Sequence, residues 1–373
     1  MARILIGAQN FGLGPASKAE TIARELSGTH AIDFVGDGDA HRFALDENLY
    51  ARVFTRSALA RIDLSSYQAI VSVMEPHTAL AGYHAQIPTI AVDSLFGFWT
   101  WDAPETYEPH VETMRRLTLS DAIALLDSFE NQAQQWFTHR LSDRSYVQSD
   151  PLREQHDDPD RGLRAIHTVG PIISAARRGV NGSRILVNTC GLTSPVVDRA
   201  QAHRYVALID RMIEPLIEAF PDHTFEHVGN ALDTIPKRFW SHRGWLPKHE
   251  YLARLASSKA LLIPASLTSY NEARASGVPV FILPEQHDGH RPNYDAIGPL
   301  PHALLSERYP ELTRVEESGV TAIHDRIATI LDEPDGYLES ATARIRAFIE
   351  HPPAPARAEA PARIGAEIER LIR

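Results

Sequence analysis

Residues 267 to 284, LTSYNEARASGVPVFILP, contain the side-chain types that bind anions. A Ser/Thr-rich turn leads into a short segment carrying one carboxylate, Glu272, which stops at Gly277 and Pro279 before an apolar run. A helix that begins on such a loop directs backbone N–H groups and the positive end of its dipole at a ligand. The order predicts a loop, a helix, a tight turn and a buried strand, with a phosphate-type anion at the start of the helix.

Three other side chains are candidates for proton transfer. Glu75 and His77 lie in VMEPHTA, and Asp93 lies in AVDSLFGFWTW, each after an apolar run that predicts a strand. Ligands of open α/β sheets bind at the carboxyl ends of strands, and a general base must reach the group that it deprotonates by hydrogen bond. We therefore expect the catalytic base among Glu75, Asp93 and His77, with a helix-cap or surface role as the alternative for each.

Four aromatic residues come directly after Asp93: Phe96, Phe98, Trp99 and Trp101. They predict either an aromatic acceptor pocket or ordinary core packing, because large aromatic side chains serve both.

Two series of strands and helices must position these groups. Predicted strands of the first series are 3–8, 31–38, 69–74 and 89–93, with a helix at 17–26. Predicted strands of the second series are 184–189, 224–229, 260–265 and 279–284, with a helix at 205–220. Strands that alternate with helices predict parallel sheets, so the fold class is α/β with two Rossmann-like domains.

The domain boundary is expected near residues 165 to 183, after the polar segment 140–165. This predicts an N-terminal domain at 1–165 and a C-terminal domain at 184–350. Residues 351–373 form a Pro/Ala linker and a helix with an apolar stripe: Ile364, Ile368, Leu371 and Ile372. An unattached stripe needs a surface to cover it, so this helix is expected to cross back onto the N-terminal domain.

The composition limits the partners. The formal net charge of −11 disfavours nucleic-acid polymers and anionic membranes, and no apolar run predicts a membrane span. The N-terminal segment MARILIGAQNFG predicts a strand rather than a secretory signal. The single Cys190 allows no internal disulfide, which favours a reducing, cytoplasmic location.

From Gly244 to Asn293 the chain resembles the GT-B glycosyltransferases, especially the natural-product and other UDP-sugar-dependent enzymes. The donor site of that family runs Trp-x-Pro, a strand, a Ser/Thr loop, Glu, GVP, a strand ending in Pro, and a polar loop ending in Asn. The matching residues here are Trp245, Pro247, Ser266, Thr268, Ser269, Glu272, Gly277, Val278, Pro279, Pro284 and Asn293. The resemblance implies that Trp245 stacks on uracil, that the Ser/Thr loop binds the diphosphate and that Glu272 accepts hydrogen bonds from the ribose hydroxyls.

The sequence departs from this family pattern at the sugar. Lys248 replaces the usual Gln after Trp-x-Pro, and His290 stands where a Gln is expected, followed by Arg291. A guanidinium can hold a carboxylate through two hydrogen bonds, which suggests a uronic acid donor such as UDP-glucuronate. The donor-binding residues implied by the resemblance are Trp245, Leu246, Lys248, Ser266, Leu267, Thr268, Ser269, Glu272, His290 and Arg291.

The first loop, GAQNFGLGPASK, resembles the acceptor loop of the same family, with Gly12, Gly14, Ser17 and Lys18 as its candidate residues. The histidine that acts as the base in the family is replaced by Pro15, which cannot take a proton. The base must therefore come from elsewhere, or the acceptor must need little help. The Gly-x-Gly-x-x-Gly spacing of NAD-binding proteins is absent, which disfavours a dehydrogenase.

The resemblance implies an inverting glycosyltransferase that uses a UDP-sugar and a small acceptor, with no cofactor and no metal. A nucleobase acceptor such as cytosine, as in the cytosylglucuronate synthases of nucleoside antibiotic biosynthesis, is compatible with the lost histidine. Two alternatives stay open: a GT-B-fold UDP-sugar 2-epimerase, and a non-catalytic nucleotide-binding protein. The sequence does not indicate the oligomeric state.

Overall fold

The computed structural model describes residues 1–148, 162–163, 165–174, 182–189, 191–194, 196–313, 319–333, 335–355 and 361–372. Its contacts divide the chain into two compact units, Met1–Ile173 with Ala360–Arg373, and Ser174–Glu359. The first division falls inside the expected boundary region of 165 to 183. Cys190 lies outside the described residues.

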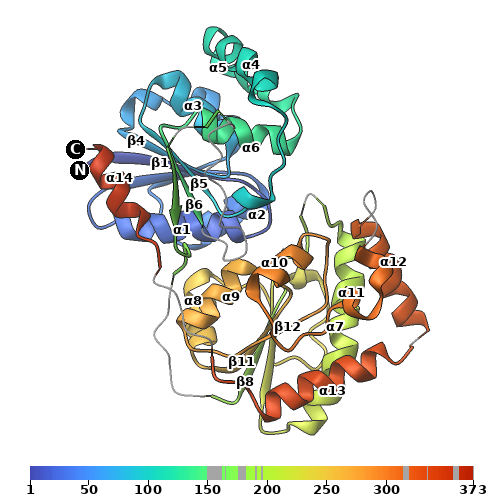
Figure 1. Ribbon diagram of the computed structural model, residues 1–373. Coiled ribbons are helices and arrows are strands. Elements are labelled where there is room, and N and C mark those ends of the chain that lie inside the picture. Colours follow the sequence, from blue (N-terminus) through green and yellow to red (C-terminus); the bar gives the residue numbers. More distant parts are fainter. Residues whose placement is uncertain are drawn as a thin grey trace. The chain divides into compact units, whose positions relative to one another are not determined.

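The N-terminal unit is built on one parallel sheet of seven strands in the order β3-β2-β1-β4-β5-β6-β7 (Figure 1). Its strands are β1 (Arg3–Ala8), β2 (Ala31–Val35), β3 (Arg52–Phe54), β4 (Ala69–Val73), β5 (Thr89–Asp93), β6 (Arg144–Gln148) and β7 (Ile166–Val169). Its helices are α1 (Gly14–Leu26), α2 (Gly38–Asp46), α3 (Pro76–Ala85), α4 (Pro104–Arg116), α5 (Leu119–Asp127), α6 (Asn131–Arg140) and α14 (Ile364–Ile372). The four strands predicted from sequence in this unit are β1, β2, β4 and β5.

Three strands extend the sheet beyond what the sequence predicts: β3 at one edge, and β6 and β7 at the other. β6 and β7 lie in or after the segment 140–165, which reads as polar, and they pair parallel to β5 and to each other. The polar residues of β6 are satisfied inside the fold: Ser145 contacts His139, and Gln148 accepts a hydrogen bond from the backbone N of Ile172. A strand with such internal partners lacks the apolar run that identifies buried strands in a sequence.

The last helix packs on the N-terminal unit, as the fold-class prediction expected. α14 contacts α1, and its Ile364 and Ile368 are buried. The backbone N of Gly365 donates to Glu25 Oε2 at 2.7 Å, and a Cβ at this glycine would lie 2.7 Å from the Glu25 side chain. A residue without a side chain is therefore required where α14 approaches α1.

The C-terminal unit contains a parallel sheet of five strands in the order β10-β9-β8-β11-β12 (Figure 1). Its strands are β8 (Arg184–Asn188), β9 (Thr224–Val228), β10 (His242–Gly244), β11 (Ser258–Ile263) and β12 (Val280–Ile282). Its helices are α7 (Arg199–Ala219), α8 (Lys248–Ala256), α9 (Leu267–Ala275), α10 (His290–Ile297), α11 (Leu305–Arg308), α12 (Gly319–Asp332) and α13 (Tyr337–Glu350). The short β10 is absent from the sequence prediction.

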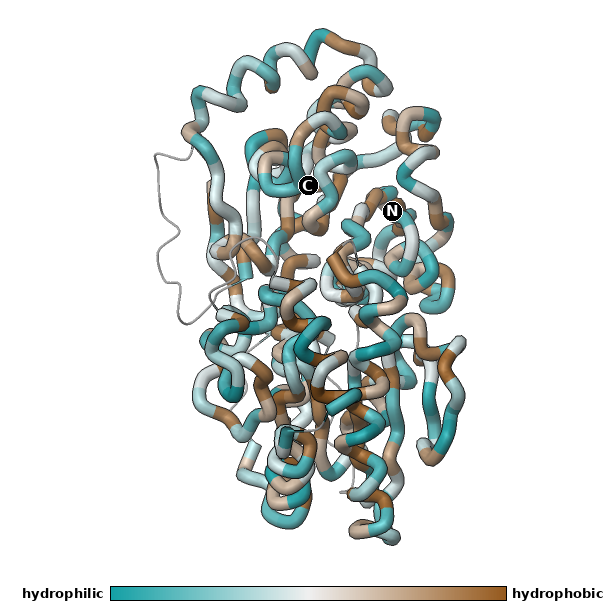
Figure 2. Tube along the Cα trace, turned by 90° about the vertical axis from the view of Figure 1, so that its right-hand side faces the viewer, coloured by the Kyte–Doolittle hydropathy of each residue, from teal (hydrophilic) through white to brown (hydrophobic). Residues whose placement is uncertain are grey.

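Alternate residues of the central strands supply two cores, one on each face of this sheet. Ile185 and Val187 of β8 pack in a cluster with α7, α12 and α13, whereas Leu186 packs in a second cluster with α8 and α9. This period of two is expected when helices cover both faces of a parallel sheet. Hydrophilic and hydrophobic residues alternate along the helices, as the colours of Figure 2 show.

Candidate active site

The N-terminal sheet reverses its strand order between β1 and β4. β1 pairs with β2 on one side and with β4 on the other, so right-handed crossovers carry the chain away from this point in opposite directions. Gln9 directly follows β1, and Met74 and Glu75 directly follow β4. Ligands of open parallel sheets bind at such a switch point, which makes this edge a candidate ligand site.

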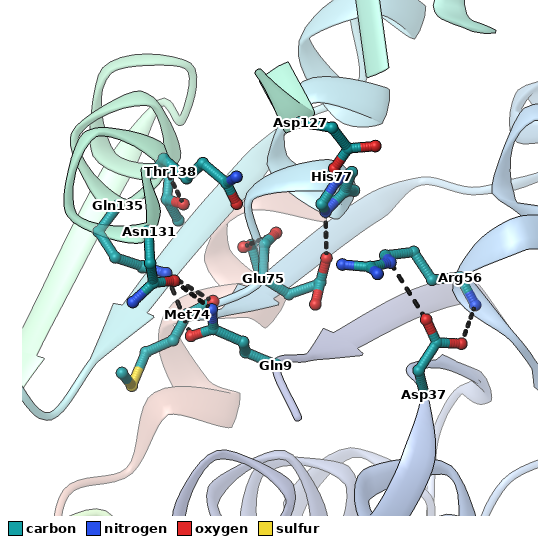
Figure 3. Close-up of polar contacts among 12 residues, drawn as sticks. Gln9, Asp37, Arg56, Met74, Glu75, His77, Asp127, Asn131, Gln135 and Thr138 are labelled. Carbon is teal, nitrogen blue, oxygen red and sulfur yellow. Dashed lines mark hydrogen bonds and ion pairs between the residues drawn. The ribbon is translucent and has the colours of Figure 1, made fainter. Parts of the chain in front are cut away.

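Glu75, His77 and Asp127 form one chain of hydrogen bonds at this edge (Figure 3). His77 Nδ1 lies 2.8 Å from Glu75 Oε1, and His77 Nε2 lies 2.7 Å from Asp127 Oδ1. Glu75 is the N-cap of α3, and Asp127 is the last residue of α5. The side chains of His77 and Glu75 are 1% and 5% exposed, whereas that of Asp127 is 54% exposed. The chain therefore runs from a buried carboxylate to one that meets solvent.

The imidazole of His77 is held toward its charged form. Burial lowers the pKa of His77, but hydrogen bonds and charges from Glu75 and the hydrogen bond to Asp127 raise it more, and the net shift is upward. The positive charge of Arg56 opposes the shift, and its Nε pairs with Asp37 Oδ2 at 3.1 Å. A protonated His77 donates from both ring nitrogens, which satisfies both of its carboxylate partners.

Amide side chains lie beside Glu75 at the same edge (Figure 3). Gln135 of α6 donates to the backbone O of Met74 at 3.1 Å and to Gln9 Oε1 at 3.2 Å, and Gln9 donates to Asn131 Oδ1 at 2.6 Å. Gln135 is fully buried, and its Oε1 has no hydrogen-bond partner among the described residues. A buried amide oxygen of this kind is suited to accept a hydrogen bond from a ligand.

The backbone at Met74 is strained where these groups meet. Its φ is 54°, which lies in the left-handed region that residues other than glycine rarely adopt. The residue is buried, and its backbone N donates to Val92 O at 3.0 Å. Strain of this kind persists where surrounding contacts fix the chain, and it is concentrated at functional sites.

Asp93, the other carboxylate candidate from the sequence, belongs to a different network. It accepts hydrogen bonds from the backbone N of Leu95 at 2.6 Å and from Trp99 Nε1 at 2.7 Å. His139 Nε2 lies 3.0 Å from the same carboxylate, and His139 Nδ1 lies 2.9 Å from Ser145 Oγ. Asp93 is also buried. These partners come from β5, β6 and α6, so Asp93 connects these elements of the fold.

The aromatic residues after Asp93 divide between the core and polar contacts. Phe96 is buried and packs edge-on against His139 and Trp101, with ring centroids 4.9 and 5.5 Å apart. Trp99 donates to Asp93, and Trp101 Nε1 donates to the backbone O of Gln132 at 2.7 Å. Phe96 therefore fills the core.

The residues expected in the acceptor loop straddle the start of α1. Gly12 has a φ of 62°, which a glycine adopts without strain, and Gly14 is the first residue of α1. Pro15 is in the first turn, where its missing N–H costs no helical hydrogen bond. Ser17 and Lys18 are 4% and 1% exposed, so both side chains lie inside the N-terminal unit.

The anion-binding stretch predicted from sequence lies at the carboxyl edge of the C-terminal sheet. β11 ends at Ile263, Ser266 is the N-cap of α9, and α9 begins at Leu267. Ser269 in the first turn of α9 accepts a hydrogen bond from Asn188 Nδ2, at the end of the neighbouring strand β8, at 3.3 Å. The sequence therefore brings hydroxyl groups and a helix N-terminus to one sheet edge, the arrangement that holds phosphates.

Glu272 is buried in α9 and forms an ion pair with Lys248, the first residue of α8. The two side chains are 1% and 6% exposed. A buried pair of this kind is costly to break, because the remaining charge is left in a medium of low dielectric. Lys248, which departs from the family pattern, thus fixes the carboxylate that the resemblance assigns to the ribose.

The Trp-x-Pro segment connects β10 to α8. The backbone N of Trp245 donates to Asp233 Oδ1 at 3.2 Å, and the side chain of Trp245 is half-buried. Leu246 packs against the same core cluster as Tyr270 of α9. Thr268 is in the first turn of α9, next to Leu267.

His290 and Arg291 open α10, and they differ sharply in exposure. His290 is buried; its Nδ1 accepts from the backbone N of Gln286 at 3.1 Å, and its ring lies 3.9 Å from that of His287. Burial and the neighbouring His287 lower the pKa of His290 well below its ordinary value. Arg291 is 43% exposed, with its Nε 3.4 Å from Asp295 Oδ1.

Gln286, which the sequence did not single out, lies at the same edge after β12. It is 1% exposed, and its Oε1 has no hydrogen-bond partner among the described residues. Its backbone O contacts His324 Nε2 at 2.9 Å, and burial lowers the pKa of His324 to about 4. The Glu-Gln pair at 285 and 286 was visible in the sequence, but nothing there indicated that its amide would be buried.

No group of three or more His, Cys, Asp or Glu side chains is placed to hold a metal ion in the part of the chain that the structure describes. Within the same residues, no helix has both the length and the apolar character needed to cross a membrane.

Comparisons with known proteins identify the fold. No protein family profile and no curated protein sequence matches the chain. Among solved structures, MnaA of S. aureus with UDP is 12% identical over 98% of this chain and 94% of its own, with a TM-score of 0.51. Os79 of O. sativa with UDP is 14% identical over 99% of both chains, with a TM-score of 0.50. The glycosyltransferase of kitacinnamycin is 14% identical over 100% of this chain and 99% of its own, with a TM-score of 0.49. The architecture confirms the expected GT-B fold.

Proposed function

We propose that the chain is a glycosyltransferase that moves a sugar from a UDP-sugar to a small acceptor, with inversion and without a metal. The observation that carries the proposal is the C-terminal sheet edge, where the loop before α9, the first turn of α9 and the Lys248–Glu272 pair come together. Two structures that share the fold, MnaA and Os79, hold UDP. Their likeness supports a uridine diphosphate donor.

In this proposal, the leaving diphosphate meets Ser266, Thr268 and Ser269, together with the backbone N–H groups of the first turn of α9. Oriented donors stabilise the charge that develops on the leaving oxygen without reorganising. Trp245 stacks on the uracil. Glu272, fixed by Lys248, accepts hydrogen bonds from the ribose hydroxyls. Leu246 and Leu267 border the nucleotide, and Gln286 and His290 face the sugar.

We assign the general base to Glu75. The acceptor loses its proton to a Glu75 carboxylate oxygen while its lone pair forms the bond to the anomeric carbon, and UDP leaves with the electron pair of the broken C–O bond. Glu75 lies at the switch point of the N-terminal sheet, whereas Asp93 is enclosed by three donors. Pro15 replaces the histidine that serves as the base in the family, so the base must come from another residue, and Glu75 is a carboxylate at the sheet edge.

We also propose the identities of the two substrates. Arg291 supports a uronic acid donor such as UDP-glucuronate, because a guanidinium binds carboxylates through paired hydrogen bonds. The amides of Gln9, Asn131 and Gln135 support an acceptor with its own amide-like edge, such as cytosine. Transfer to cytosine would belong to nucleoside natural-product biosynthesis.

The test is turnover of purified protein with UDP-glucose, UDP-N-acetylglucosamine or UDP-glucuronate, with and without cytosine, followed by mass spectrometry of the products. The proposal expects UDP and a glycosylated acceptor only when donor and acceptor are both present. An epimer of the UDP-sugar formed without acceptor would instead support the 2-epimerase alternative. UDP binding without any turnover would support a non-catalytic nucleotide-binding protein.

A further inference from the structure

We propose that Asp127, acting through His77, keeps Glu75 in its charged and oriented form, so that the three side chains work as one unit. This inference rests on the proposed function, because only that function makes Glu75 a general base. Asp127 is a positioning residue, since it contacts His77 and not Glu75. Nothing in the sequence connects it to Glu75: it lies 50 residues beyond His77, at the end of another helix.

The side chain of Glu75 does not cap the backbone of α3, the helix that it begins. A polar N-cap residue ordinarily accepts a hydrogen bond from the first turn, but the Glu75 side chain makes no cap hydrogen bond to α3. It turns to His77 Nδ1 instead. Because His77 is also held at Nε2, its ring has two fixed ends, and this fixes the carboxylate oxygen that it contacts.

The charges around His77 explain why Asp127 matters. Glu75 and Asp127 face the ring from the ends of β4 and α5, and Arg56 approaches from the 3₁₀ turn that also packs on α3. The charge of Arg56 is shared with Asp37. Without Asp127, burial and Arg56 would act against one carboxylate only. His77 would then lose its proton more readily, and Glu75 would lose its cationic partner.

The direct test is the titration of His77 in the whole protein, followed by NMR of its ring protons and assigned with His77→Gln. We expect Asp127→Asn to lower the titration midpoint of His77 by about one pH unit, and Asp127→Glu to restore most of it. Glu105→Gln is the matched control, because it removes an exposed carboxylate from the first turn of α4. It should leave the midpoint of His77 unchanged.

The second test is the pH profile of transfer from UDP-glucuronate to cytosine. A carboxylate base is active only when ionised, so activity falls as pH drops. Losing the positive charge beside Glu75 favours its protonated form, and the acid limb of kcat/KM should move to higher pH in Asp127→Asn by about one unit. The fall should reach about tenfold on the acid limb, where a shift of one unit changes the ionised fraction by that factor, and it should appear in kcat, with the KM for the donor unchanged.

These readouts separate the inference from the proposed function. An unchanged His77 titration in Asp127→Asn overturns the inference even if transfer is observed. A shifted titration with an unchanged acid limb also overturns it, because the unit would then not serve the base. If wild-type protein transfers no sugar, the proposed function fails, and the assignment of Glu75 as a base fails with it.

Discussion

The carboxyl edges of the two sheets carry different kinds of polar group. At the N-terminal edge, His77 lies between two carboxylates, and its pKa is raised. At the C-terminal edge, the histidines are buried beside one another, and burial lowers the pKa of His290 and His324. The same parallel sheet topology thus supports a histidine held toward its charged form in one unit and histidines held toward their neutral form in the other.

The difference matches the chemistry proposed for each edge. A base needs a carboxylate that stays ionised, and a cation beside it favours that form. A diphosphate already carries negative charge, so it is better served by hydroxyls, backbone N–H groups and a helix N-terminus than by further carboxylates. The carboxylate of Glu272 at that edge is neutralised by Lys248.

The largest expected effect is the loss of the base. Glu75→Gln keeps the shape of the side chain but removes its capacity to take a proton, and it should lower kcat by about 10² to 10⁴-fold. The affinity for UDP, measured by calorimetry, should not change, because the nucleotide is assigned to the other unit. Glu105→Gln is the control for loss of one exposed carboxylate. Retention of more than about a tenth of the wild-type kcat would remove Glu75 from the role of base.

The second prediction concerns the buried pair of the C-terminal unit. Lys248→Met leaves Glu272 buried with its charge uncompensated, so the free energy of unfolding should fall by about 3 to 5 kcal/mol. The double change Lys248→Met with Glu272→Leu should recover much of the stability, because apolar side chains replace the pair.

UDP affinity distinguishes a structural pair from a ligand-binding one. Glu272→Ala should weaken UDP binding by about 1 to 3 kcal/mol, the scale of hydrogen bonds lost to a charged group. The double variant Lys248→Met with Glu272→Leu should still bind UDP weakly, although its stability is recovered. Wild-type affinity for UDP in the folded double variant would restrict Glu272 and Lys248 to packing.

The third prediction uses the opposite pKa shifts of the two edges. The folded pKa of His324, about 4, lies below its ordinary value of 6.5, so the unfolded chain binds more protons between these values. Its contribution to stability is complete above pH 6.5 and is lost as the pH falls toward 4, by about 2 to 3 kcal/mol. His77 has the opposite sign: its stabilisation is present below its unfolded pKa and is lost as the pH rises through the raised value.

Thermal unfolding followed from pH 4 to 8 measures these contributions. His324→Gln should flatten the acid side of the stability profile, and His77→Gln should flatten the side above neutrality. His84→Gln is the control, because His84 also contacts a backbone carbonyl, that of Leu117, at 2.8 Å. Equal slopes in all three variants would show that the two edges do not differ in the way proposed.

The contrast between the edges also explains what the sequence could predict. The C-terminal edge is local in the chain: β11, the loop and α9 follow one another, so residue types and spacing identify Ser266, Ser269 and Glu272 together. The N-terminal edge is assembled from distant parts. Asp127 and Gln135 come from α5 and α6, and single Asp or Gln residues in amphipathic helices carry no motif. Glu75 and His77 could be predicted as candidates only because they follow a predicted strand, β4.

The polar strand β6 was missed for a related reason. Its Ser145 and Gln148 are buried because they bond to His139 and to the backbone of Ile172, partners that a sequence does not reveal. The exposure of Arg291 was equally invisible, since neighbouring residues of one short helix, His290 and Arg291, differ only in the direction they face. A sequence therefore does not predict which distant residues bond to one another, or which way the side chains of a short helix face.

The smallest expected effect concerns the donor sugar. Arg291 is 43% exposed; its Nε lies 3.4 Å from Asp295 Oδ1, and its Nη1 donates to Ser306 Oγ at 3.2 Å, so binding a sugar carboxylate would compete with these partners. We therefore expect Arg291→Ala to weaken the binding of UDP-glucuronate by about 1 to 2 kcal/mol and to leave the binding of UDP and UDP-glucose unchanged. Arg291→Lys should recover little, because an ammonium does not reproduce the paired hydrogen bonds of a guanidinium. Asp295→Asn is the matched variant. It frees the guanidinium from its ion pair and should slightly strengthen the binding of UDP-glucuronate. Calorimetric titration of the three ligands decides the matter, and equal losses for all three in Arg291→Ala would show that Arg291 supports the loop and not the uronate.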